Sequence, residues 1–280
     1  MALGAEVPIA ARLVRIDRFP IKSLDGQSVA RSRVTAAGAL WGDRRWRLVD
    51  DQGKTVNAKG CAAIHHIRAT FDDTLASVTL TWGDGDRTDA PAPDQFSLTA
   101  AGLGAIAQWC SDALGKTVTV EEDGDRGFPD DVHFWGPTLI STATLTTVAS
   151  WFPGLGVDEL RRRLRTNLEI DGVPPFWEDH LYGPTPESEP VPFRIGAIDL
   201  LGCNPCLRCV VPTRHPDHGD PLPRFAAIVS RQRQATLPPT VPRSRFEPFY
   251  RLALNTRIAP LEADRRGDRT LAVGDRLREP

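Results

Sequence analysis

The sequence is poor in tyrosine and methionine, and it contains no long apolar stretch. Its 280 residues include 2 tyrosines and 1 methionine, against 24 prolines and 23 glycines. No apolar run approaches the roughly 20 residues that a membrane-spanning helix needs. The segment Met1–Arg12 lacks the basic start and the apolar core of an export signal. We therefore expect a cytoplasmic protein with no membrane partner, and the prolines and glycines favour many short strands and turns.

Neither sign of charge dominates. The chain has 34 basic and 36 acidic side chains, which gives a formal net charge of -2. Proteins that bind nucleic acid or acidic membrane surfaces usually carry a basic patch or a net positive charge. We therefore expect no nucleic-acid partner. The length is typical of one or two domains.

The spacing of apolar residues predicts more strands than helices. Alternating patterns predict strands at residues 12–19, 45–49 with 54–56 as a hairpin, 67–71, 76–82 and 193–201. Apolar residues at spacings of three and four predict helices at residues 99–114, 142–151, 157–164 and 224–234. An acidic, glycine-containing stretch at residues 121–131 is a plausible connection between two units.

Three of the five cysteines lie within seven residues of each other. An odd number of cysteines without an export signal argues against a disulfide framework. Cys203, Cys206 and Cys209 form a C-x2-C-x2-C run, a spacing at which thiolates can converge on one metal centre, as in iron–sulfur proteins. A zinc ion would also accept His215 or His218 as a ligand.

The alternative is that some of these cysteines are simply buried apolar residues. We favour that interpretation for Cys203 taken alone, and for Cys110, which lies on the apolar face of a predicted helix. Arg208 would favour the thiolate form of a neighbouring cysteine, which is the form that ligates metals. A metal or redox role is therefore favoured for the group, but the spacing does not select the metal.

The sequence around these cysteines resembles the signature of the MOSC domain. It reads Asn204-Pro-Cys206-Leu-Arg-Cys209-Val-Val-Pro-Thr213, followed by His-Pro-Asp217-His-Gly219. The N-terminal part resembles the β-barrel domain that accompanies MOSC domains, in Phe19-Pro-Ile-Lys22-Ser23, Ala37-Gly38 and Gly42-Asp43-Arg44-Arg45-Trp46. A third match is Leu164-Arg165-Thr-Asn167-Leu168. These motifs occur in the family's order and span nearly the whole chain.

The resemblance implies a mixed, mostly β (α+β) fold. It places an N-terminal MOSC-associated β-barrel domain at residues 8–122. A C-terminal MOSC β-barrel domain with a few helices would follow at residues 123–280.

The resemblance also implies a molybdenum cofactor, which is a pterin dithiolene carrying a phosphate. Cys209 matches the protein thiolate that ligates molybdenum, and it is the candidate catalytic residue. The candidate cofactor-binding residues are Lys22, Ser23, Arg44, Arg165, Asn167, Leu207, Arg208 and Phe249. Cations and hydrogen-bond donors suit a phosphate and a polar pterin. The residues come from both predicted domains, so the cofactor is expected between them. Pyridoxal phosphate binding is a further association that the resemblance suggests.

By this resemblance we expect a molybdenum-dependent oxidoreductase. The best-known relatives, the mitochondrial amidoxime-reducing components and their bacterial relatives, reduce N-hydroxylated small molecules. The chain lacks the ferredoxin-like domain that some relatives carry, so electrons would come from a separate protein of the reductase, ferredoxin or cytochrome type. Two alternatives stay open: a sulfur carrier or cofactor-binding protein that uses a cysteine persulfide, and an iron–sulfur or zinc module.

The sequence departs from the family at several positions. Thr166 replaces a common proline, and the segment 133–138 lacks the acidic and hydroxyl pattern that contacts phosphate in relatives. The segment 172–177 is bulky, which would reshape a substrate pocket. Glu178 and Asp179 are candidates for supplying protons to a substrate, although we favour the interpretation that they are exposed loop carboxylates.

Overall fold

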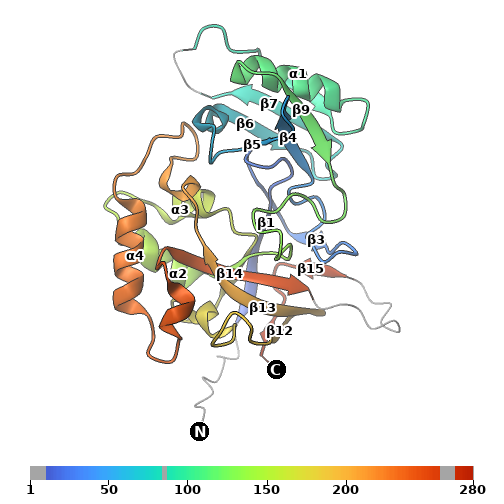
Figure 1. Ribbon diagram of the computed structural model, residues 1–280. Helices are drawn as coiled ribbons and strands as arrows, with labels where there is room; N and C mark the ends of the chain where they lie inside the picture. The colour runs from blue at the N-terminus through green and yellow to red at the C-terminus, as the bar shows by residue number, and fades with distance from the viewer. Residues whose placement is uncertain (1–10, 84–86, 259–268, 280) are drawn as a thin grey trace.

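The computed structural model describes residues 11–83, 87–258 and 269–279. Its elements form two bodies, one built around a large mixed sheet and one around two small sheets and a helix (Figure 1). We call the first the large-sheet body and the second the small-sheet body. Strands outnumber helices, and the predicted mixed α+β class is confirmed. In the described part of the chain each sheet is open, so the expected barrels do not close.

The large-sheet body contains an eight-stranded sheet. Its order across the sheet is β16 (Leu277–Arg278), β12 (Val191–Ile195), β13 (Ile198–Leu207), β14 (Arg251–Ile258), β10 (Leu139–Ser141), β11 (Leu168–Asp171), β1 (Arg12–Arg18) and β2 (Gln27–Val29). Only β10 and β11 run parallel; the other neighbours are antiparallel. Leu13 and Ile16 of β1 point into the core beside Leu168 of β11.

The N-terminal segment therefore completes a sheet made mostly of C-terminal strands. A further pair, β3 (Arg31–Arg33) with β15 (Thr270–Ala272), joins the two ends of the chain in the same way. Such long-range pairing places the loop after β1 at the junction of the two bodies (Figure 1). Strands from both sides of residue 122 share one sheet. The division into two domains after that residue stays a prediction.

The small-sheet body holds two three-stranded sheets and one helix. The first sheet consists of β5 (Thr55–Val56), β4 (Trp46–Asp50) and β9 (Val118–Glu122), and the second of β6 (Ile67–Phe71), β7 (Ser77–Trp82) and β8 (Asp94–Ser97). Helix α1 (Leu103–Leu114) buries Ile106, Trp109 and Cys110 against them, which confirms Cys110 as a core residue. The helix begins four residues later than predicted, because glycines at its start are poor helix formers.

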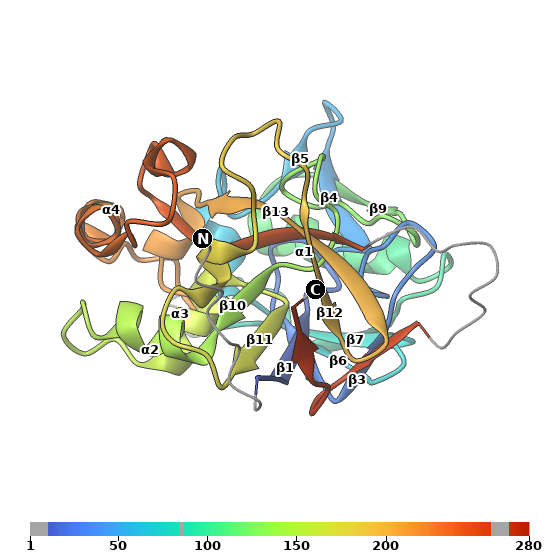
Figure 2. The ribbon, with the colours of Figure 1, turned by 90° about the horizontal axis from the view of Figure 1, so that it is seen from below.

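The other helices gather on one side of the eight-stranded sheet, away from β12 and β15 (Figure 2). They are α2 (Thr142–Ala149), α3 (Val157–Leu164) and α4 (Phe225–Thr236), with short 3-10 turns η2 (Trp177–His180), η3 (Val211–Thr213) and η4 (Arg243–Phe246). The turn η1 (Ala62–His66) packs in the small-sheet body, where Ile64 is part of the core. Phe152 and Phe225 stack at 4.7 Å between α2 and α4. No helix in the described ranges is both long and apolar enough to cross a bilayer.

The single strand predicted at residues 193–201 is wrong. It is a hairpin of β12 and β13, which turns at Gly196 with a left-handed φ of 58°. Alternation of apolar residues continues through the turn, so the pattern alone could not reveal it. Two register shifts interrupt the pairing of β13 with β14, after Gly202 and after Pro205. Such bulges bend a strand, and here they change the direction of the end of β13, where Cys206 lies.

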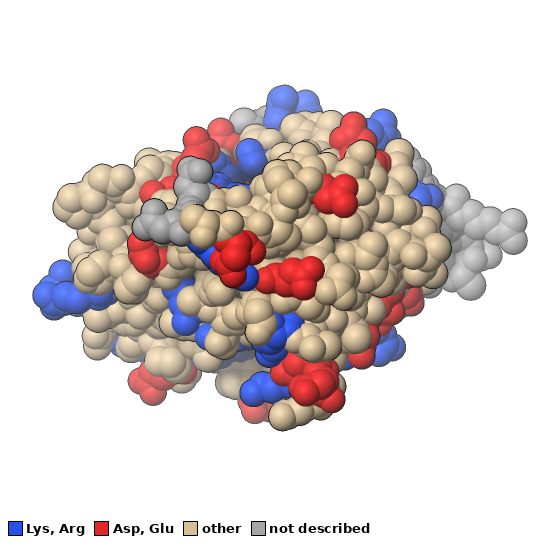
Figure 3. All heavy atoms as spheres, turned by 90° about the horizontal axis from the view of Figure 1, so that it is seen from above, with Lys and Arg blue, Asp and Glu red and all other residues tan. Residues whose placement is uncertain are grey.

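On the face of the small-sheet body seen in Figure 3, acidic and basic side chains are interspersed and neither sign forms a broad patch. This view agrees with the near-neutral net charge of -2. The expectation of no nucleic-acid partner stays a prediction.

Candidate functional site

A cavity of about 390 Å³ lies at the junction of the two bodies. We call it the Cys209 cavity. It gathers all but one of the residues predicted to form a site, namely Lys22, Ser23, Arg44, Arg165, Asn167, Leu207, Arg208 and Cys209. The first three follow β1 or precede β4, and the others follow α3 or end β13. The exception is Phe249, which packs partly buried against the large core and under the guanidinium of Arg243.

Arg208 anchors the cysteine end of β13. Its backbone N–H donates to the carbonyl of Tyr250 at 2.9 Å, and its side chain binds the carbonyl of Leu164. Its Nη1 donates to the sulfur of Cys206 at 3.3 Å. A guanidinium beside a thiol stabilises the thiolate. Burial lowers the pKa of Arg208, but the thiols of Cys206 and Cys209 raise it more, so the net shift is upward.

Two buried polar atoms of this cavity have no hydrogen-bond partner among the described residues. They are Nε of Arg208 and Oδ1 of Asn204. Buried polar groups are nearly always paired, so unpaired ones in a cavity point to a missing ligand or water. Asn204 lies within the cysteine motif, and the motif predicts no role for it. Only the burial of its Oδ1 in the folded chain marks it as a candidate.

Seven cations line the cavity, namely Lys22, Arg44, Lys59, Arg126, Arg163, Arg165 and Arg208. Lys22, Arg44 and Arg165 differ in how far nearby acids neutralise them. Nζ of Lys22 binds Asp130 at 2.9 Å and the carbonyl of Phe128 at 2.7 Å. Burial lowers the pKa of Lys22. Arg44 binds the carboxylate of Asp43 and, at 3.2 Å, the carbonyl of Arg165.

Arg165 itself has no carboxylate partner in the described ranges, and its guanidinium lies 4.2 Å from the ring of Phe19. Burial and the nearby Arg44 lower its pKa to about 10. A buried guanidinium without a counter-ion is costly. It therefore favours an anion in the cavity.

Left-handed backbone conformations are concentrated at this site. Seven non-glycine residues in the described ranges have positive φ, and three of them are Ser23, Arg44 and Arg165 with φ of 74°, 49° and 53°. Such conformations cost about 1–3 kcal/mol each and are kept where the surroundings enforce them, often at functional sites. Arg165 takes this conformation as the C-cap of α3, which turns its side chain towards the junction.

Asn167 holds the site together without a free donor or acceptor of its own. Its Oδ1 accepts from the backbone and hydroxyl of Thr138, each at 3.1 Å, and its Nδ2 donates to the carbonyl of Asp17 at 3.0 Å. These contacts join the segment before β10 to β1 and to the segment before β11. Asn167 therefore positions Arg165 and Arg44 rather than presenting its amide to the cavity.

Residues 10–117 match the family model of the MOSC N-terminal beta barrel domain. This N-terminal part of the chain belongs to that domain family. The chain is 26% identical over 187 residues to the molybdenum cofactor sulfurase of Caenorhabditis elegans, which covers 60% of this chain and 25% of that protein. It is 23% identical over 252 residues to the molybdenum cofactor sulfurase of Drosophila willistoni, covering 81% of this chain and 30% of that protein. The chain thus spans less than a third of the length of these relatives.

The three clustered cysteines of this chain do not share one environment. Cys206 and Cys209 line the Cys209 cavity, whereas Cys203 lies outside it and donates weakly to the carbonyl of Leu201 at 3.4 Å. Burial raises the pKa of Cys203 to about 11. Over residues 11–83, 87–258 and 269–279, no three or more His, Cys, Asp or Glu side chains are arranged to hold a metal ion. The geometry gives no support to a multi-ligand iron–sulfur or zinc site.

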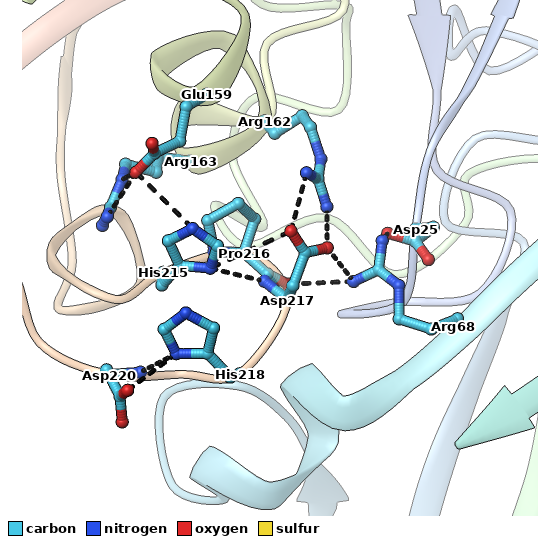
Figure 4. Close-up of polar contacts among 10 residues, drawn as sticks. All are labelled: Asp25, Arg68, Glu159, Arg162, Arg163, His215, Pro216, Asp217, His218 and Asp220. Carbon is cyan, nitrogen blue, oxygen red and sulfur yellow. Dashed lines mark hydrogen bonds and ion pairs between the residues drawn. The ribbon is translucent and has the colours of Figure 1, made fainter. Parts of the chain in front are cut away.

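The turn after the cysteines ties the two bodies together (Figure 4). Asp217 binds Arg162 of α3 and, at 2.7 Å, Arg68 of β6. The rings of His215 and His218 stack with centroids 3.8 Å apart. The two histidines therefore pack on each other within a loop, and Asp217 makes the ion pairs at the junction.

The interpretation of Glu178 and Asp179 as exposed loop carboxylates is wrong. Their exposed fractions are 1% and 6%. Asp179 binds the fully buried Arg233, whose guanidinium lies 4.0 Å from the ring of Phe176. Neither acid is among the described residues that line the Cys209 cavity. Asp179 links η2 to α4 through Arg233, whereas Glu178 is buried without a cation.

Proposed function

We propose that this chain binds a molybdenum cofactor in the Cys209 cavity and reduces N-hydroxylated small molecules. The observation that carries the proposal is the meeting of two thiols, seven cations and two unpartnered polar atoms in one cavity of about 390 Å³. That volume falls in the range of about 300–1,000 Å³ that small-molecule sites occupy. The names of the sulfurase relatives support a link to the same cofactor.

The donor set of the cavity fits such a group. Cys209 would supply a soft thiolate, which suits molybdenum. Arg165, which lines the cavity, would donate hydrogen bonds to the polar part of the cofactor. Asn204 and Arg208 would give their free Oδ1 and Nε to a polar pterin edge. Lys22 would contribute less, because Asp130 already neutralises it.

The chain's own residues would orient the ligands and set the charge around them. When bound, the cofactor supplies the oxidation–reduction chemistry that removes an oxygen atom from the substrate. Arg208 would place a positive charge beside the ligand, and its hydrogen bond to the sulfur of Cys206 holds the guanidinium in place. Leu207, which is 51% exposed, offers an apolar contact beside the cysteine for a small organic substrate. Electrons would come from a separate donor protein of the reductase, ferredoxin or cytochrome type.

The test measures molybdenum and pterin in protein purified from a host that makes the cofactor. We expect about one of each per wild-type chain, a loss of molybdenum in Cys209→Ala, and wild-type content in the matched control Cys203→Ala, whose thiol lies outside the cavity. The loaded wild type should then reduce an amidoxime in the presence of an electron donor. Equal molybdenum in the wild type and in Cys209→Ala would overturn the assignment.

A second function is favoured by the contact between Arg208 and the sulfur of Cys206, at 3.3 Å. The thiol of Cys206 could take the sulfane sulfur from the persulfide of a cysteine desulfurase, which returns to its free thiol, and pass that sulfur to a ligand beside Cys209. Cyanolysis of protein exposed to a cysteine desulfurase would then release thiocyanate from the wild type and not from Cys206→Ala. Full molybdenum content and amidoxime reduction in Cys206→Ala would favour the reductase over this alternative.

A further inference from the structure

A second cavity, of about 600 Å³, lies on the other side of Arg165. We call it the arginine cavity. Ser23, Arg163, Arg165 and Val211 line both cavities and so form the wall between them. The arginine cavity is lined by seven arginines, Arg15, Arg68, Arg161, Arg162, Arg163, Arg165 and Arg214, and by three aspartates, Asp17, Asp25 and Asp158. None of the residues proposed to ligate molybdenum faces it.

Most of these charges are already paired within the protein. Each lining aspartate is bound by one arginine, in the pairs Arg15–Asp17, Arg68–Asp25 and Arg161–Asp158. Two further arginines are bound by acids at the edge of the cavity, Arg162 by Asp217 and Arg163 by Glu159 (Figure 4). These five arginines are therefore committed to internal ion pairs.

Two arginines remain without a carboxylate among the described residues. Arg214 donates from Nη1 to the carbonyl of Ala58 at 2.6 Å, and Arg165 contacts only the ring of Phe19 through its guanidinium. Both arginines line the same cavity. Two guanidinium groups without a carboxylate partner therefore share a partly closed space, where electrostatic attraction to an anion is strengthened by the low dielectric.

His65 lies beside these two cations. Its side chain is 8% exposed, it lines the cavity, and its Nε2 has no hydrogen-bond partner among the described residues. Its pKa falls to about 4, first because burial disfavours the charged ring and then because Arg165 and Arg214 repel it. The positive charge of Arg165 and Arg214 therefore acts on His65 as well. His65 also adds a buried nitrogen that has no partner among the described residues.

We propose that the arginine cavity binds a phosphate-bearing small molecule, with the phosphate between Arg165, Arg214 and His65. A phosphate dianion matches two unpaired guanidinium groups in charge, and guanidinium binds phosphate through parallel hydrogen bonds. In the tautomer that carries its hydrogen on Nε2, neutral His65 can donate that N–H to a phosphate oxygen. The volume of about 600 Å³ exceeds that of a bare phosphate, which leaves room for the organic part of a phosphomonoester.

This ligand is distinct from the occupant of the Cys209 cavity. Arg214 and His65 line the arginine cavity and not the Cys209 cavity, so a phosphate held by them lies beyond the Arg165 wall. The proposal therefore stands without the molybdenum assignment. Because Arg165 lines both cavities, the two ligands would meet at this residue.

Calorimetric titration of the full-length, cofactor-free chain with inorganic phosphate tests the proposal. We expect saturable binding by the wild type and at least tenfold weaker binding by Arg214→Gln and by His65→Gln. The matched control Arg194→Gln removes an arginine from β12, where it pairs with Asp199 away from both cavities, and should bind as the wild type does. Thermal melting of each variant verifies its fold, and two independent variants keep the test valid if one fails to fold.

Two further arms separate this site from the proposed function. Cys209→Ala should bind phosphate as the wild type does, whether or not it has lost molybdenum. Wild type loaded with cofactor should still bind phosphate. Any of three results would overturn the proposal. They are no phosphate binding by the cofactor-free wild type, phosphate binding by Arg214→Gln and His65→Gln as tight as that of the wild type, or loss of phosphate binding when the wild type is loaded with cofactor. The last result would instead mean that the phosphate belongs to the occupant of the Cys209 cavity.

Discussion

Glu178 is an acid buried in the large-sheet body without a cation. Its side chain is 1% exposed, its Oε1 accepts a long hydrogen bond of 3.4 Å from the backbone of Ser141, and its Oε2 has no partner among the described residues. Burial, followed by the charge of the neighbouring Asp179, raises its pKa from 4.5 to about 7. The ionised form of Glu178 therefore opposes folding.

The size and the pH range of this effect follow from the two pKa values. The folded pKa lies above the unfolded one, so the folded state binds the proton more tightly. The penalty begins as pH rises past the unfolded value near 4.5 and is complete above about 7. At about 1.4 kcal/mol for each pH unit, the difference between 4.5 and about 7 corresponds to about 3 kcal/mol.

Glu178→Gln keeps the shape of the side chain and removes its titration. We expect the variant's free energy of unfolding, relative to that of the wild type, to increase by about 2 kcal/mol between pH 5 and pH 8. Urea unfolding followed by tryptophan fluorescence at both pH values measures this change. The matched control is Asp179→Asn, which leaves the buried Arg233 without its carboxylate and should destabilise at both pH values. A stability difference for Glu178→Gln that is the same at pH 5 and pH 8 would refute the reasoning.

Two other substitutions test the packing and the junction. Gly202→Ala would place a Cβ 1.8 Å from a backbone oxygen, so we expect a loss of about 3 kcal/mol in urea unfolding, whereas Gly60→Ala, with no atom within 4 Å, should change stability by less than about 0.5 kcal/mol. Equal stability of these two variants would contradict the close packing of β13. Asp217→Asn removes the carboxylate shared by Arg162 and Arg68, and because these groups are partly exposed we expect a loss of about 1 kcal/mol that shrinks in 1 M salt. A loss that is independent of salt would show that ion pairing is not its cause.

Local sequence patterns predicted the regular elements well. The bounds of α3 and β6 agree with the prediction, since each has a clear apolar period and a clear end. Helix α3 ends at Arg165, whose left-handed φ of 53° is a common way to close a helix. The hairpin at Gly196 was missed because apolar alternation continues on both sides of its turn.

The candidate site was predictable only in part. Cys206 and Cys209 are close in sequence, so their spacing alone predicted a shared environment, and the family's motifs pointed to Lys22, Arg44 and Arg165. The roles of Asn204 and His65 could not be predicted, because each is defined by a buried atom that lacks a partner. Whether an atom finds a partner depends on residues distant in the chain.

The sequence by itself determined the balance of strands and helices, the absence of a dominant charge, and the order of the motifs, because these depend on residue types and on their near neighbours. The tertiary structure decided which charges remain unpaired. Asp130 neutralises Lys22 across 108 positions of the chain, whereas Arg165 and Arg214 meet no carboxylate in the described ranges. Ion pairing and burial act through space, so only the folded chain could distinguish a structural arginine from one that awaits a ligand.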